Sequence, residues 1–193
     1  QPHVVIGDYL NGVRKKYLNV VSYSAIALTL TGFQVFMLKN FYPETLDVSH
    51  INGSDYDAAQ MDWFFDYQTL IFFLNIPISA FIAKVSFFRQ KKFNYIEHLA
   101  ITAYLVGQFT ITTTLLIILS STIGINYYTF GVISNFLFIA YTTFTYKKLY
   151  AINMKETIIG ILIFFLTFVL VIMLISIIFG FYLYQSGALE NLN

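Results

Sequence analysis

Five long apolar segments dominate this chain and limit the folds that it can adopt. They run from Asn19 to Leu38, from Asp66 to Phe88, from Leu99 to Leu119, from Gly124 to Thr145 and from Thr157 to Tyr184. Each is close to or above about 20 residues, the length of helix that crosses roughly 30 Å of hydrocarbon. Their apolar residues are continuous, whereas barrel strands alternate apolar with polar positions. The sequence therefore predicts an all-α integral membrane protein, a bundle of about five transmembrane helices.

The overall composition agrees with a membrane location. Hydrophobic residues make up 58% of the chain and charged residues only 11%, against about 45–50% and about 25% in soluble domains. A soluble fold of this length could not bury so much apolar surface. The chain has no cysteine, so its residues supply no disulfide, iron–sulfur ligand or cysteine zinc site.

The positions of lysine and arginine predict the orientation, because cytoplasmic loops hold the excess of these residues. Lys39 alone lies clearly on one side, and Lys84 lies inside the second segment near its basic end. The other side holds nine basic residues: Arg14, Lys15, Lys16, Arg89, Lys91, Lys92, Lys147, Lys148 and Lys155. We therefore expect a cytoplasmic N-terminus and an external C-terminus.

The same patterns divide the chain into three predicted parts. Residues 1–18 form a cytoplasmic interfacial segment, residues 19–184 a five-helix transmembrane domain with an external loop at 39–65, and residues 185–193 an external tail. The chain begins with Gln1 instead of Met, so we expect a preceding segment. No signal peptide is expected in the interfacial segment, which is too polar. The net charge of +1 gives no reason to expect a nucleic-acid partner.

The segment before the first apolar run has a four-residue repeat. Val5, Tyr9, Val13 and Tyr17 recur at helical spacing, with polar and basic residues between them. This pattern suits a short helix lying in the cytoplasmic interface, whose basic end meets anionic headgroups. A plain positively charged topology signal explains the basic residues equally well.

Two short motifs resemble an uncharacterised family of multi-pass inner-membrane proteins of the Bacteroidota. The first is the stretch from Val5 to Asn19, and the second is Phe93-Asn94-Tyr95-Ile96-Glu97-His98-Leu99. The resemblance covers about the first two-thirds of the chain and departs at Val20, where the family tends to have proline. It implies a membrane location and marks positions to mutate, without a reaction: Tyr9, Gly12, Arg14, Tyr17, Glu97 and His98. Family members often carry a zinc ribbon ahead of this region, which is absent here.

Glu97 and His98 are the ionisable pair at the start of the third apolar segment. A carboxylate and an imidazole at a membrane edge could relay protons or bind a polar substrate. The run from Asn94 to Glu97 also has the form of a helix capping box, and the run from Asn153 to Glu156 repeats that form. We therefore favour a structural role for Glu97 and a functional role for His98.

Other motifs favour structure over chemistry. His3 and His98 are predicted on the opposite side of the membrane from His50, so no metal site is expected. The acidic residues near Asp55 suit a solvated loop better than a calcium site, and Asn52 fits a turn better than a glycosylation site. Small residues spaced for close helix packing form two pairs, Ala103 with Gly107 and Ser79 with Ala83.

These observations favour a non-catalytic accessory or scaffold subunit of a larger complex in the cell inner membrane. Its expected partners are membrane lipids and other membrane-protein subunits, without a cofactor. One alternative is a small transporter or channel component, with Pro77 at a hinge and Lys84, Glu97 and His98 at a cytoplasmic vestibule. A further alternative is a lipid-acting membrane enzyme with His98 as base.

Overall fold

The computed structural model describes residues 1–46 and 58–185, and this part of the chain is helical without a β-strand. The prediction of an all-α fold is confirmed. The long helices are α2 (Val20–Phe41), α4 (Ala58–Ser86), α5 (Tyr95–Ser121), α6 (Tyr127–Tyr150) and α7 (Met154–Gln185). Three shorter elements accompany them: α1 (Pro2–Leu10), η1 (Pro43–Leu46) and η2 (Phe88–Gln90).

Four of the long helices have the length and apolar character needed to cross a membrane. The qualifying stretches are Val20–Phe41, Phe65–Ser86, Tyr95–Thr122 and Met154–Ile178. The fifth long helix, α6, is not among them, although it has 24 residues. Its five tyrosines and four threonines lower its hydropathy. The structure therefore confirms four helices suited to a membrane, while a fifth span stays a prediction.

Asparagine marks the beginning of four of the long helices. Asn19 accepts a hydrogen bond from the Ser22 amide at 2.8 Å, and Asn126 accepts one from the Tyr128 amide at 2.9 Å. Asn94 and Asn153 do the same before α5 and α7. An N-cap side chain satisfies an amide that has no partner inside the helix, typically contributing about 1 kcal/mol.

α1 is shorter than the repeat from Val5 to Tyr17 predicts. The helix ends at Leu10, and Gly12 adopts a φ of +93°. Glycine has no Cβ atom, so it adopts this left-handed conformation at little cost, whereas residues with a side chain rarely do. The chain can therefore turn here. Val13 and Tyr17 consequently lie in the connection to α2 and not on a continuous helix.

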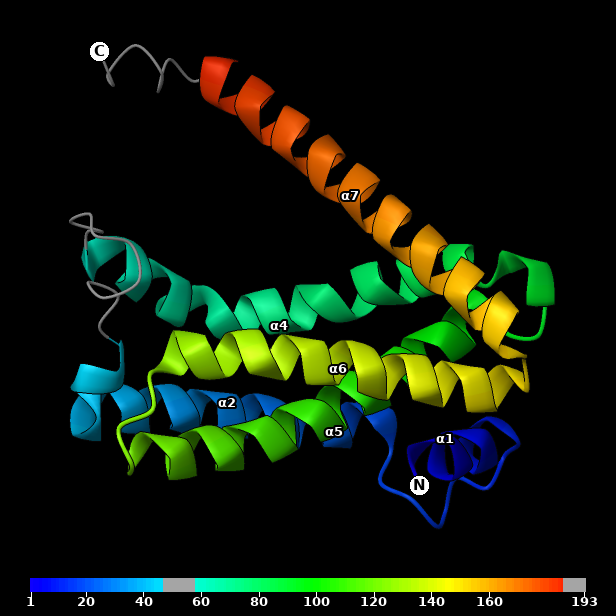
Figure 1. The fold of residues 1–193 in the computed structure, drawn as a ribbon, viewed down its shortest axis with the longest axis horizontal. Helices are drawn as coiled ribbons and strands as arrows, with labels where there is room; N and C mark the ends of the chain where they lie inside the picture. The colour runs from blue at the N-terminus through cyan, green and yellow to red at the C-terminus, as the bar shows by residue number, and fades with distance from the viewer. Residues whose placement is uncertain (47–57, 186–193) are drawn as a thin grey trace.

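α2, α4, α5 and α6 lie side by side, and α7 diverges from them (Figure 1). α5 packs against α2, α4 and α6, so it forms the centre of the bundle. α7 packs mainly on α4, at the end of the bundle where α7 begins, and then leaves the other helices. α1 packs against α5 and α6.

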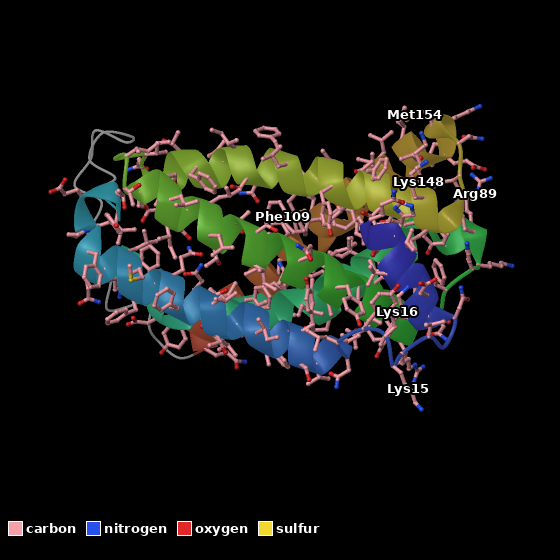
Figure 2. The ribbon with its side chains drawn as sticks, turned by 90° about the horizontal axis from the view of Figure 1, so that it is seen from below. Lys15, Lys16, Arg89, Phe109, Lys148 and Met154 are labelled. Carbon is pink, nitrogen blue, oxygen red and sulfur yellow. The ribbon has the colours of Figure 1, made fainter. Side chains whose placement is uncertain are left out.

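The basic residues gather at one end of the bundle. Figure 2 shows Lys15, Lys16, Arg89 and Lys148 together at this end, which we call the basic end. Lys39 lies near the other end of α2, where its ammonium nitrogen contacts Asp66 Oδ1 at 3.2 Å. The fold thus brings basic residues from the segment between α1 and α2, from η2 and from the last turn of α6 to the same end of the bundle.

The predicted external loop is partly helical. We expected a loop over residues 39–65, but α4 begins at Ala58 and η1 covers Pro43–Leu46. The predictions for His50, Asn52, Asp55 and Asp57 lie outside the described residues.

Candidate functional site

Tyr9, Arg14 and Tyr17 surround the turn that leads from α1 towards α2. The Arg14 guanidinium lies over the Tyr9 ring, 5.6 Å from its centroid. The Tyr17 hydroxyl donates to Asp8 Oδ2 at 2.7 Å, and Lys16 Nζ lies 3.9 Å from the same oxygen. Tyr17 and then Asp8 raise the pKa of Lys16 above its ordinary value. These contacts join residues on both sides of the turn and stabilise it.

Aromatic contacts fasten this turn to the bundle. The rings of Tyr9 and Tyr104 meet edge to face with centroids 5.2 Å apart. The Tyr104 hydroxyl donates to the Leu18 carbonyl, and the Tyr104 ring also lies 5.5 Å from that of Tyr23. The N-terminal residues that the sequence singles out therefore hold the segment before α2 against α5.

Glu97 caps α5. Its carboxylate accepts a hydrogen bond from the Asn94 amide at 2.7 Å, and Asn94 Oδ1 accepts one from the Glu97 amide at 2.9 Å. The predicted capping box is confirmed. Asn153 and Glu156 make the same two bonds at the start of α7, at 3.3 Å and 2.9 Å. Both carboxylates are thus engaged in holding helix ends.

His98 lies inside the protein, with 1% of its surface exposed. Its Nε2 atom is 2.8 Å from the Tyr150 hydroxyl, and the Phe93 ring meets it edge-on. Its Nδ1 atom is buried and makes no hydrogen bond within the described part of the chain. The structure connects α5 to the end of α6 through this histidine.

Glu97, His98 and Lys84 differ in their burial and in their hydrogen-bond partners. Glu97 bonds to the start of its own helix, His98 is buried, and Lys84 is exposed on α4. Among the described residues, no hydrogen bond or ion pair joins any two of these three. A cytoplasmic vestibule at these three side chains therefore stays a prediction.

The small residues predicted for helix packing lie at close helix contacts. A Cβ atom added to Gly107 would lie 3.0 Å from the Tyr23 ring on α2. Ala83 and Ala103 are both buried. Ser79 lies on the same helix as Ala83, and its hydroxyl donates to Asn75 Oδ1 at 2.9 Å.

A second glycine contact was not anticipated from the sequence. A Cβ atom added to Gly160 on α7 would lie 2.6 Å from Cε1 of Phe87. Phe87 in turn stacks on Tyr146 and Tyr150, with centroids 5.1 Å and 4.8 Å away. Gly160 therefore lets the start of α7 dock on the aromatic residues of the basic end. Its spacing from Thr157, one helical turn earlier, was the available signal.

α4, α5, α6 and α7 line an open groove with a volume of about 360 Å³, which we call the amide groove. Apolar side chains form most of its wall. Asn75 and Ser79 from α4 and Asn135 from α6 are polar residues that also line it. Asn75 is the eleventh residue of the 22-residue stretch Phe65–Ser86, and Asn135 is the ninth of the 24 residues of α6. Since α4 and α6 both run towards the basic end, their amides lie at similar depth.

Each of these amides has an unused hydrogen-bonding group. Asn75 Oδ1 accepts a hydrogen bond from the Ser79 hydroxyl, but the Asn75 side-chain nitrogen donates to no other described residue. Asn135 donates to the Gly131 carbonyl at 2.9 Å, while its side-chain oxygen has no donor within the described ranges. Sequence analysis passed over both residues, although an isolated asparagine inside an apolar run was a visible signal.

A larger cavity, of about 720 Å³, lies between α1, α2, α5 and α6. We call it the N-terminal cavity. Pro2, Leu18 and Tyr104 line it near the basic end, and Thr112 and Leu137 line it further along the bundle. Tyr141 also lines the cavity; its hydroxyl is buried and makes no hydrogen bond among the residues described.

Comparison with known proteins adds no assignment to this geometry. The resemblance to the Bacteroidota family therefore stays a prediction. No family model, curated protein or solved structure matches this chain.

Proposed function

We propose that this protein is a five-span inner-membrane protein that binds a transmembrane helix of another subunit in its amide groove. In this role it is a non-catalytic accessory subunit, with its N-terminus in the cytoplasm. The observation that carries the proposal is the pair of incompletely bonded amides, Asn75 and Asn135, at similar depth in one groove.

The chemistry of the groove favours a helix over a lipid tail. A hydrocarbon chain offers no hydrogen-bond partner to an amide, and unsatisfied polar groups inside a bilayer are costly. A polar side chain on a neighbouring helix can satisfy them, which is a recurrent way of joining membrane helices. The Asn75 nitrogen is available as a donor and the Asn135 oxygen as an acceptor, so one amide or hydroxyl side chain could satisfy both.

The course of α7 leaves this groove room to accept a helix. Thr157, Gly160 and Phe164 line it from the first turns of α7, where that helix docks. Beyond these turns α7 leaves the bundle (Figure 1). A partner helix can therefore lie between α4 and α6 and contact the exposed flank of α7 along its length.

Two observations support the predicted topology. The basic end collects the connections before α2, between α4 and α5, and between α6 and α7 (Figure 2), and such charge is typical of the cytoplasmic side. α5 and α7 both begin at the basic end, so α6, which connects them, must cross the same thickness in the direction opposite to α5. Its 24 residues extend about 36 Å, enough to span.

Site-specific crosslinking tests the docking proposal. The chain has no cysteine, so Asn135→Cys can carry a single thiol-reactive photo-crosslinker in native membranes. We expect a discrete protein adduct from this position. The matched control is Phe136→Cys, the next residue along α6, because Phe136 is 70% exposed and lines neither cavity.

The second variant tests the contribution of the Asn75 amide, because Asn135 is already replaced in the crosslinking variant. Asn75→Leu, added to Asn135→Cys, should lower the adduct yield about threefold, since one interhelical hydrogen bond in a membrane is worth about 0.6 kcal/mol. Equal adducts from positions 135 and 136, or no protein adduct from either, would contradict the proposal.

Thiol labelling tests the fifth span separately. Thr122→Cys and Lys148→Cys place one thiol near each end of α6. In spheroplasts, a membrane-impermeant maleimide should label position 122 and should label position 148 only after permeabilisation. Labelling of both positions from the same side would eliminate α6 as a span.

A further inference from the structure

We infer that the N-terminal cavity is a binding site for an anionic phospholipid, with an acyl chain in the cavity and the headgroup at the basic connection between α1 and α2. This inference goes beyond the docking of a partner helix, because it concerns a different cavity and a different ligand.

The shape of the cavity suits an acyl chain. On α5, its wall extends from Tyr104 to Thr112, which is about 12 Å along the helix. Leu137 on α6 is 57% exposed and Thr112 is also exposed, so a chain can enter from the side of the bundle. Figure 2 places Phe109, another wall residue, near the middle of the bundle and Lys16 at the basic end.

The polar groups inside the cavity match the ester region of a lipid. The Tyr23 hydroxyl donates to Gln108 Oε1 at 2.5 Å, and the Gln108 nitrogen donates to Thr112 Oγ1 at 3.2 Å. These groups are already paired. Tyr141 has a buried hydroxyl without a partner in the described part of the structure, and a lipid ester carbonyl would accept its hydrogen bond.

The basic residues that precede the cavity lining in the chain favour an anionic headgroup. Tyr17 and Leu18 line the cavity and directly follow Arg14, Lys15 and Lys16 in the chain. Asp8 contacts Lys16, while Lys15 makes no ion pair with another described residue. The connection thus carries an excess of positive charge, and each such residue near a membrane surface attracts anionic lipid by about 1 kcal/mol.

The experiment measures binding of fluorescent phosphatidylglycerol and phosphatidylcholine to the full chain in detergent micelles. We expect saturable binding of about one phosphatidylglycerol, with phosphatidylcholine at least tenfold weaker. Thr112→Trp should reduce phosphatidylglycerol binding severalfold by filling the cavity. Its control is Leu119→Trp, on the same helix at an exposed position outside the cavity.

Charge reversal tests the headgroup contact. Lys15→Glu combined with Lys16→Glu should weaken phosphatidylglycerol binding at least tenfold, whereas Lys155→Glu, on α7 at the same end, should leave it unchanged. Equal binding of the two lipids, equal effects of Thr112→Trp and Leu119→Trp, or displacement by inorganic phosphate alone would overturn the inference. These outcomes are independent of the protein adducts that test the amide groove.

Discussion

α5 and α7 are both long apolar helices, but the structure uses them in opposite ways. The spanning stretch of α5 has a mean hydropathy of 1.6, and half of the residues in its most apolar part are buried in the protein. The stretch of α7 has a mean hydropathy of 3.3, and only 6% of the corresponding residues are buried. In a water-soluble protein the more apolar helix would occupy the interior. Here the more apolar helix faces outward, because lipid tails are as favourable an environment for leucine as another helix.

α5 occupies the centre because its polar groups find partners there. The Thr114 hydroxyl donates to Gln34 Oε1 on α2 at 2.9 Å, and both residues are buried. On the α6 side, Thr102 and Tyr146 share a hydrogen bond of 3.4 Å. Hydrogen bonds between helices thus accompany apolar packing around α5, while most of α7 offers only apolar surface.

The same substitution on the two helices should separate these roles most strongly. Leu105→Ala on α5 removes a side chain that is 2% exposed and should lower the free energy of unfolding by about 3 kcal/mol. Leu170→Ala on α7, where the side chain is exposed, should change it by less than about 0.5 kcal/mol. Unfolding by sodium dodecyl sulfate in mixed micelles measures both; similar losses would show that α7 is packed in the protein.

A clash at the contact between α2 and α5 should have the next largest effect. Gly107→Leu places atoms where the Tyr23 ring lies and should cost about 2 kcal/mol, as overpacking does elsewhere. Gly131→Leu on α6 is the control, because a Cβ there meets nothing within 4 Å. The same unfolding assay applies, and equal effects at both glycines would refute the close contact.

Loss of the histidine contact should be somewhat milder. His98→Leu leaves the buried Tyr150 hydroxyl without its partner and should cost about 1.5 kcal/mol. Adding Tyr150→Phe removes the stranded hydroxyl, so the double variant should lose less than the sum of the two single variants. Strict additivity would mean that the hydrogen bond contributes nothing to folding.

The N-terminal turn should show the smallest of these changes. Tyr17→Phe removes the hydrogen bond to Asp8 and should cost about 1 kcal/mol or less. Limited proteolysis of the segment before α2 measures the release of this segment more directly than global unfolding. Tyr67→Phe on α4 provides a distant control, and equal proteolysis rates in the two variants would argue against a fastened turn.

Local features of the sequence were enough to predict that the chain is helical and where some of its helices begin. Continuous apolar runs identified the long helices, and Asn94 with Glu97 identified a capping box that the structure confirms. These features depend only on residues within one or two turns. The start of α4 was misplaced, because the residues from Ala58 to Asp66 include polar side chains that hydropathy assigns to a loop.

Only the tertiary structure decided which side chains share a site. Glu97 and His98 are neighbours in the chain, yet one bonds to a helix end and the other lies buried beside Tyr150. Asn75 and Asn135 lie far apart in the chain, on α4 and α6, and line one groove. The apolar pattern determined that the helices enter a membrane. It did not determine their neighbours, because lipid and protein are both apolar surroundings, and the choice between them depends on close packing and hydrogen bonds made by single residues.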